Sequence, residues 1–158
     1  MLKYIVGVFS LTMLLSCQPE GRVYNEFKVL SPNLEWLKKD VRVFSIPVSQ
    51  SEIGYNLSLS FRHSDAYMRN NLKVKITETS PSGVEKVLNH TVKLKDESGK
   101  FVGEPGFDIW DVEDVIESNY QYLEIGTYEY KIEHQMIEDQ LHYAMDIGLI
   151  LDEVIKLD

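Results

Sequence analysis

The chain is poor in cysteine, alanine and basic residues, and these shortages limit the classes of protein to which it can belong. Its 158 residues include one cysteine and two alanines. A single thiol excludes both a disulfide framework and a thiolate zinc cluster. Sixteen basic residues against 25 acidic ones give a formal net charge of −9, which argues against nucleic-acid binding because that function needs a basic face. The length suits one domain, and a hydrophobic content of 44% excludes a wholly disordered chain.

Long apolar runs are also missing, apart from one near the start of the sequence. Lys3 is followed by an apolar run of twelve residues, 4–15, which a helix extends over only about 18 Å. That length is too short for a bilayer core of about 30 Å and is typical of the apolar part of a signal peptide. The run ends in Leu14-Leu15-Ser16-Cys17, a sequence that resembles a bacterial lipobox.

Cleavage before Cys17 makes this residue the N-terminus that carries the lipid. Two or three acyl chains anchor a protein firmly, because each buried methylene contributes about 0.8 kcal/mol. The alternative is a plain signal peptide followed by a buried cysteine, but the sole cysteine stands at the cleavage position. We therefore expect a signal peptide in 1–16, a lipidated tether in 17–22 and one domain in 23–158. The mature chain has 15 basic and 25 acidic residues, a charge of −10.

Apolar and polar residues alternate along most of the mature chain. The alternation is clearest in five segments: 55–62, 72–77, 88–95, 128–133 and 143–151. A period of two predicts strands with one solvated face, as in antiparallel sheets. Residues 23–30 and 41–48 are further strand candidates. Scarce alanine and nine tyrosines favour strands as well.

The connections between these segments carry typical turn residues. Ser80–Gly83 and Asp96–Gly99 both read as tight turns between neighbouring strands. A short helix is expected only in 110–118, where Ile109, Val112 and Ile116 fit one helical face. Short strands separated by such turns predict an all-β fold, an antiparallel β-sandwich (Ig-like or jelly-roll-like) with at most one short helix.

Motifs for catalysis or metal binding are scarce. The four histidines form no HExxH or close His-x-His pair, and no G-x-S-x-G elbow is present. His90 and His134 fall on apolar strand faces, where we expect packing roles. His63 lies at a strand end, and His142 lies near Glu138 and Asp139 in an expected loop. We expect no enzymatic activity, no metal and no cofactor.

One glycine-rich stretch, 99–114, is a candidate binding segment through Phe101, Asp108 and Trp110. Oxygen ligands for calcium are one interpretation, based on the acids at 108, 111, 113 and 114, although their spacing does not match an EF-hand. A crossover loop with acids beside a helix N-terminus is the interpretation we favour. Trp110 is either an exposed platform or, in the reading we favour, a plug for one end of the sandwich.

A second candidate segment, 62–72, links two expected strands and contains Arg62, Asp65 and Tyr67. Such residues in a loop suit partner recognition. They equally suit a turn that satisfies its own polar groups, with Asp65 bonding nearby amides. We favour the turn.

These stretches together resemble the gliding-motility lipoprotein GldH family of the Bacteroidota. The resemblance begins at Cys17 and spans about 130 residues. It rests on the order of several short motifs: Val23-Tyr24, Phe27, Pro32-Asn33 with Trp36, Tyr55-Asn56-Leu57 to Arg62, Tyr67, Asn71-Leu72, Ser80-Pro81-Ser82-Gly83, Gly99-Lys100 with Gly103, Gly106 and Asp108, Gly126-Thr127-Tyr128, Glu133 to Met136, and Asp146-Ile147-Gly148-Leu149. The chain has His63 where the family usually has asparagine and Phe101 where members often have tryptophan.

The resemblance implies a lipoprotein linked to gliding and to the type IX secretion system, with no enzymatic activity and no known cofactor. Cys17 is the one functional residue that it carries over. Gln18 in place of aspartate does not suggest retention in the inner membrane. We therefore expect an outer-membrane lipoprotein, facing the periplasm or displayed on the surface, that works by contacts with envelope proteins of the gliding or secretion apparatus or in envelope maintenance. The alternative is a lipid-anchored module that binds a glycan or another ligand through exposed aromatic residues.

Overall fold

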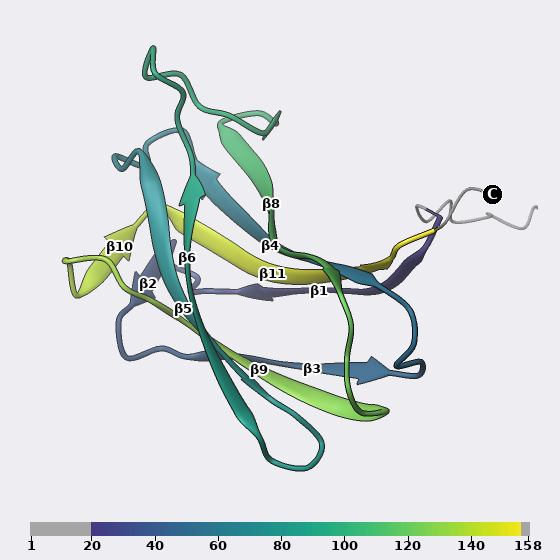
Figure 1. Cartoon of the computed structure of the whole chain (residues 1–158). Coiled ribbons are helices and arrows are strands. Elements are labelled where there is room, and N and C mark those ends of the chain that lie inside the picture. Colours follow the sequence, from purple (N-terminus) through teal and green to yellow (C-terminus); the bar gives the residue numbers. More distant parts are fainter. Residues whose placement is uncertain (1–19, 156–158) are drawn as a thin grey trace, which may run out of the picture.

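The computed structural model describes residues 20–155, and all regular structure within them is β (Figure 1). There are eleven strands in this part of the chain. Their bounds are β1 Arg22–Val29, β2 Glu35–Leu37, β3 Arg42–Val48, β4 Tyr55–Ser64, β5 Asn71–Thr79, β6 Glu85–Lys93, β7 Glu104–Pro105, β8 Ile109–Tyr120, β9 Gly126–His134, β10 Gln140–His142 and β11 Ala144–Glu153. The predicted signal peptide and Cys17, the predicted site of lipid attachment, lie outside the described residues.

Two antiparallel sheets form a sandwich, as the alternation predicted. The first has five strands in the order β1-β11-β4-β8-β7, and the second has four in the order β3-β9-β5-β6. Figure 1 shows the sheets as two layers, with β1, β11 and β4 in one and β3, β9 and β5 in the other. A small pair, β10-β2, lies at one end. No helix in the described part of the chain has the length and apolar character needed to cross a membrane.

The core lies between the two large sheets and is built from alternate residues of each strand. On β4 the buried positions include Leu57, Leu59 and Phe61, and on β9 they include Tyr130 and Ile132. Because side chains on a strand point alternately to opposite faces, the odd or even positions of each segment form one apolar layer. The faces predicted for 55–62, 72–77, 88–95 and 128–133 are confirmed.

The short helix predicted in 110–118 is wrong, because these residues belong to the twelve-residue strand β8. This strand pairs with β4 from Tyr120 opposite Tyr55 to Ile109 opposite Ser64. The register shifts twice near Leu57, and these irregularities break the alternation that a regular strand would show. Pairing with β4 outweighs the helical spacing of the apolar residues, since without β8 the buried strand β4 would have an unpaired edge.

The last predicted face, 143–151, is correct only in its second half. A bulge between Ala144 and Asp146 shifts the register of β11, so Ala144 is buried while Tyr143 is 44% exposed. From Ile147 onward the predicted positions are buried. His142 also differs from the expectation, because it lies in β10 and not in a loop, and its ring lies 3.5 Å from Glu35.

The strands give the sandwich two distinct ends. At the tether end, where β1 begins, the Glu153 amide donates to the Gly21 carbonyl at 2.8 Å, and Tyr55 lies opposite both Glu153 and Tyr120. At the distal end, where β4 and β1 finish, β10 and the loop between β4 and β5 lie together (Figure 1). The tether therefore enters at one end of the domain, and the longest connection between strands, 94–103, lies at the other.

Candidate functional site at the distal end

The two candidate segments of the sequence meet at the distal end. The Asp65 amide, after β4, donates to the Asp108 carbonyl at 3.1 Å, and the Ser64 amide donates to the Tyr143 carbonyl at 3.0 Å. These bonds tie the β4–β5 loop to the segment before β8 and to the start of β11. The fold thus gathers all six predicted binding residues at one end: Arg62, Asp65, Tyr67, Phe101, Asp108 and Trp110.

Arg62, which the sequence placed both at the end of the strand 55–62 and at the start of the linking segment, lies within β4. Its guanidinium donates to both carboxylate oxygens of Asp111 on β8, at 2.7 and 2.9 Å. The carboxylate of Asp146 on β11 lies 3.6 Å away. Hydrogen bonding to Asp111 raises the pKa of Arg62. The side chain therefore links three neighbouring strands on the outer face of the five-stranded sheet, a geometry that favours a bidentate arginine.

A cluster of aromatic rings closes the core at this end. The buried His63 ring lies 4.8 Å from Phe101 and 5.2 Å from Tyr67, and Phe101 lies 5.6 Å from Trp110, all measured between ring centroids. Phe101 and Trp110 are half-buried. Trp110 thus packs as a plug, the role favoured for it, and the Trp110–Phe101 pair offers no open aromatic platform for a ligand.

His63 is held in one tautomer by its neighbour. Its Nδ1 lies 2.8 Å from the Ser64 carbonyl, so Nδ1 carries the hydrogen and Nε2 does not. Nε2 is buried without a hydrogen-bond partner among the described residues. Burial lowers the pKa of His63, and the nearby Lys95 ammonium acts in the same direction. The ring is consequently neutral at pH 7 and acts as part of the packing.

The β4–β5 loop is a turn whose polar groups bond one another, as predicted. The side chain that accepts from a nearby backbone amide is that of Ser64, however, and not that of Asp65. The Ser64 hydroxyl accepts from the Ala66 amide at 3.2 Å and donates to the Asp65 carboxylate at 3.2 Å. The Tyr67 amide donates to the Ser64 carbonyl at 3.0 Å. This bonding fixes the loop and leaves the Asp65 side chain exposed.

The acids of the glycine-rich stretch point to different partners and do not converge. Asp111 binds Arg62, Glu113 lies 3.8 Å from Arg22, and Asp114 lies 3.0 Å from the half-buried His90. Within residues 20–155 no group of three or more histidine, cysteine or acidic side chains is placed to hold a metal ion. The arrangement does not support calcium binding. The favoured interpretation, a loop with acids beside a helix N-terminus, is wrong about the helix, because Asp111, Glu113 and Asp114 lie on the strand β8.

The two histidines expected on apolar faces do pack there. His90 is half-buried on the edge strand β6. His134 is fully buried, and its ring meets the edge of Trp36 at a centroid distance of 5.3 Å. Burial lowers the pKa of His134, which keeps this ring neutral as well.

Sequence reasoning missed two strongly exposed apolar side chains of the distal end. Phe107 is 93% exposed and Met68 is 80% exposed, and they come from the two segments that the Asp65–Asp108 bond joins. Both lie among turn-forming residues outside any alternating segment, and that position is the signal that could have identified them as exposed. A single exposed apolar side chain is ordinary, so it is the hydrogen bond between the two loops that makes this pair a candidate surface for a partner.

Comparison with known proteins identifies relatives over nearly the whole chain. The family model described as GldH lipoprotein matches residues 22–151. A curated protein of Flavobacterium johnsoniae, named gliding motility lipoprotein GldH, is 33% identical over 152 residues. That alignment covers 89% of this chain and 90% of the relative.

Solved structures offer only distant likenesses. The subviral particle of the infectious bursal disease virus protein VP2 is 12% identical, with a TM-score of 0.41, over 94% of this chain and 37% of the viral one. A chain of Desmodium yellow mottle tymovirus is 12% identical, with a TM-score of 0.30, over 100% of this chain and 95% of its own. We draw nothing from likenesses of this degree.

Proposed function

The chain belongs to the GldH lipoprotein family, and from this premise we propose that it is a non-enzymatic lipoprotein that works through protein contacts at its distal end. Its partners are envelope proteins of the gliding motility or type IX secretion apparatus. Cys17 carries the lipid and anchors the domain in the outer membrane. The observation that carries the proposal is the exposure of Phe107 and Met68 on two loops that a hydrogen bond joins.

The position of the tether supports this assignment. Four residues lie between Cys17 and Arg22, where β1 begins, and the five steps along the chain from Cys17 to Arg22 span at most about 18 Å. β1 then runs for eight residues toward the distal end, a rise of about 27 Å. A lipid on Cys17 therefore holds the tether end near the bilayer, while Phe107 and Met68 point into the aqueous compartment where a partner protein can reach them.

The surroundings of these side chains suit a specific contact. Aromatic and methionine side chains are enriched in protein interfaces, and a few such anchors supply most of the binding free energy. The loops behind Phe107 and Met68 are held by the Asp65–Asp108 bond, and Arg62–Asp111 joins the strands beneath them. A surface held in this way loses little conformational entropy on binding.

A crosslinking pull-down of the tagged protein from its own envelope tests the proposal. We expect gliding or type IX secretion components with the wild type and none with the unanchored Cys17→Ser form. Phe107→Ser should reduce recovery at least about fivefold, the effect of losing about 1 kcal/mol at an interface. Leu123→Ser is the matched control, because Leu123 is 91% exposed but lies in the loop between β8 and β9 at the tether end.

Two results would contradict the proposal. One is a correctly anchored wild type that recovers none of these components. The other is an equal loss with Phe107→Ser and Leu123→Ser, which would mean that apolar exposure alone, at either end, causes the capture.

A further inference from the structure

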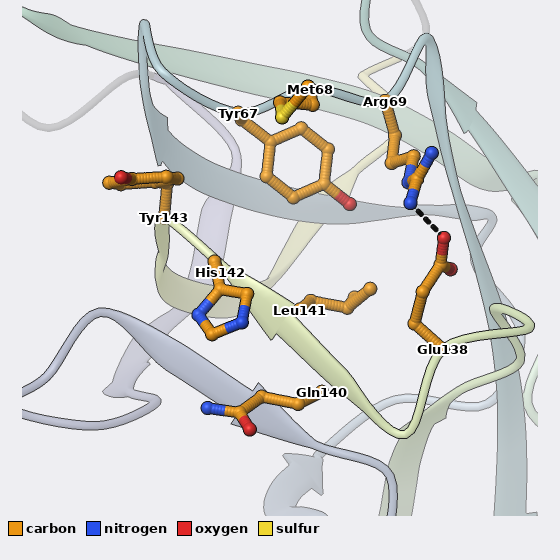
Figure 2. Close-up of a pocket in the computed structure, with 8 residues that line it drawn as sticks. All are labelled: Tyr67, Met68, Arg69, Glu138, Gln140, Leu141, His142 and Tyr143. Atoms are coloured by element: carbon orange, nitrogen blue, oxygen red, sulfur yellow. Dashed lines mark ion pairs between the residues drawn. The ribbon is translucent and has the colours of Figure 1, made fainter.

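A cavity of about 480 Å³ opens at the distal end, beside the aromatic cluster. One wall is the β4–β5 loop, through Tyr67, Met68 and Arg69, and the other is the segment from Glu138 to Tyr143, which contains β10 (Figure 2). Its volume lies within the range of about 300–1,000 Å³ found for small-molecule sites.

Two buried polar atoms in this cavity have no hydrogen-bond partner among the described residues. The first is the hydroxyl of Tyr67, whose side chain is 2% exposed, and the second is Oε2 of Glu138. Figure 2 shows the Tyr67 hydroxyl pointing toward the ion pair of Arg69 and Glu138. Buried polar atoms are nearly always paired in folded proteins, so these two atoms in the walls of one cavity are the groups with which a bound ligand would pair.

The chemistry of these atoms defines the ligand. Burial raises the pKa of Tyr67, so its hydroxyl keeps the proton and can donate. A carboxylate only accepts, so Oε2 of Glu138 needs a donor. The ligand must therefore present an acceptor and a donor side by side. Two neighbouring hydroxyl groups do this, and each can also bond the guanidinium of Arg69.

The rest of the cavity fits a sugar. Gln140 and His142 line the wall below the ion pair and offer both donors and acceptors (Figure 2). Tyr143 stands at the rim and is 44% exposed as a residue, a position from which an aromatic face can cover the apolar side of a sugar ring. Arg69 and Glu138 neutralise each other, which favours an uncharged ligand.

A second cavity continues the site on the far side of the same ion pair. It measures about 500 Å³ and is again lined by Arg69 and Glu138, together with polar side chains that include Lys38, Asn71 and Lys73. Two adjoining cavities that share one ion pair give room for more than one ring.

We propose that the distal cavity is a saccharide-binding site, in which Tyr67, Arg69 and Glu138 hold a pair of neighbouring hydroxyl groups and Tyr143 stacks on the sugar ring. This binding differs from the protein contact proposed above at Phe107, which does not line the cavity, although the two surfaces share Met68.

The test is a titration of the full lipidated protein, in detergent and in buffer free of Tris and glycerol, which carry hydroxyl groups of their own. An array of immobilised neutral mono- and oligosaccharides serves as the first probe, and calorimetry follows with each sugar that binds. Tyr67→Phe removes only the unpaired hydroxyl and should weaken binding about 2- to 10-fold, the effect of one hydrogen bond. Tyr143→Ala should weaken it at least as much, whereas Leu123→Ser should bind like the wild type.

Thermal unfolding of every variant separates lost binding from lost folding. Tyr67→Phe should keep its unfolding temperature, because the removed hydroxyl has no partner among the described residues. The proposal is overturned if the wild type binds no saccharide on the array, or if both tyrosine variants bind as the wild type does. It is also overturned if a random dodecapeptide library, but no sugar, yields ligands that depend on the Tyr67 hydroxyl.

Discussion

The hydroxyl of Tyr130 donates a 2.8 Å hydrogen bond to Oε2 of Glu78, a carboxylate that is only 4% exposed in the interior of the sandwich. The other oxygen of Glu78 accepts from the Tyr120 hydroxyl at 3.0 Å, and Tyr122 lies 2.8 Å from the Tyr130 hydroxyl. The two strands of this contact, β5 and β9, are neighbours, and Tyr120 joins them to β8 of the opposite sheet. The network therefore links the two layers near the tether end.

Tyr130→Phe should destabilise the domain by about 1.5–3 kcal/mol, because it removes a donor from a buried carboxylate. Tyr128→Phe on the same strand is the control, since its hydroxyl only accepts from the Glu124 amide, at 3.1 Å in a loop, and its loss should cost about 1 kcal/mol. Urea unfolding at pH 7 measures both. Equal losses of unfolding free energy would mean that the hydrogen bond from Tyr130 to Glu78 stabilises the domain no more than the loop hydrogen bond of Tyr128 does.

Tyr130→Asp should cost several kcal/mol, because it places a second carboxylate beside Glu78 without a partner. Thermal unfolding would show the loss directly. Unchanged stability would contradict the inward orientation of this face of β9.

The neutral, buried His63 should make stability depend on pH below about 6.5. Its pKa is lowered in the folded state, chiefly by burial, and Lys95 and Asp111 are the charged groups near it. The unfolded chain therefore binds a proton at a higher pH than the folded one, so stability is complete above the ordinary pKa of about 6.5 and falls as the pH drops below it. One such group contributes a slope of at most about 1.4 kcal/mol per pH unit.

His63→Phe keeps an aromatic ring in the cluster and should flatten that slope between pH 7 and 5, whatever it does to stability at pH 8. Denaturant unfolding at a series of pH values measures the slope. Part of it should remain, because burial also lowers the pKa of His134. A slope identical to that of the wild type would contradict the prediction.

Gly103→Ala should destabilise the distal segment by at least about 2 kcal/mol, because the strain of the backbone is added to a collision. Gly103 has φ +104°, and an added Cβ would lie 2.3 Å from the Asp111 carbonyl oxygen. Gly99→Ala is the matched control, with φ +81° but nothing within 4 Å of its Cβ, and should cost about 1 kcal/mol. Urea unfolding compares them, and equal costs would show that the contact with Asp111 relaxes.

Most of the fold follows from local patterns that can be read along the chain. Alternation identifies the faces of β4, β5, β6 and β9, and turn residues such as Ser80–Gly83 mark where strands meet. The failures lie where pairing between distant strands alters the local pattern. β8 was predicted in part as a helix because its register shifts against β4, and the start of β11 was assigned to the wrong face because of its bulge.

The distal end was harder to predict, because its geometry depends on contacts between segments far apart in sequence. The prediction that Arg62, Asp65 and Tyr67 lie on one loop was partly right, but nothing local shows that Arg62 meets Asp111, 49 residues later. The distal cavity needs Tyr67 beside Glu138, and β10 and β2, which place Glu138 and Tyr143, are three residues long each and show no alternation to detect.

Cys17→Ser should release the protein from the membrane without unfolding it. In the lipobox interpretation the sulfur atom of Cys17 carries the lipid, and a serine hydroxyl does not accept the lipid in its place. Two or three acyl chains hold a protein firmly, whereas a chain without them keeps only whatever weak contacts its surface makes. We expect the wild type in the membrane fraction, labelled by an alkyne analogue of palmitate, and the variant unlabelled in the soluble or unprocessed fraction.

Phe107→Ser is the control for the anchor, because it alters the distal end and should leave both labelling and membrane retention unchanged. Cys17→Ser should show the same unfolding temperature as the wild type, since the domain begins at Arg22, five positions after Cys17. A cleaved Cys17→Ser product that stays in the membrane fraction would contradict lipid attachment at this residue. The anchor would then have to be a surface of the folded domain, and the tether end, with Leu123 exposed beside it, would be the place to look for it.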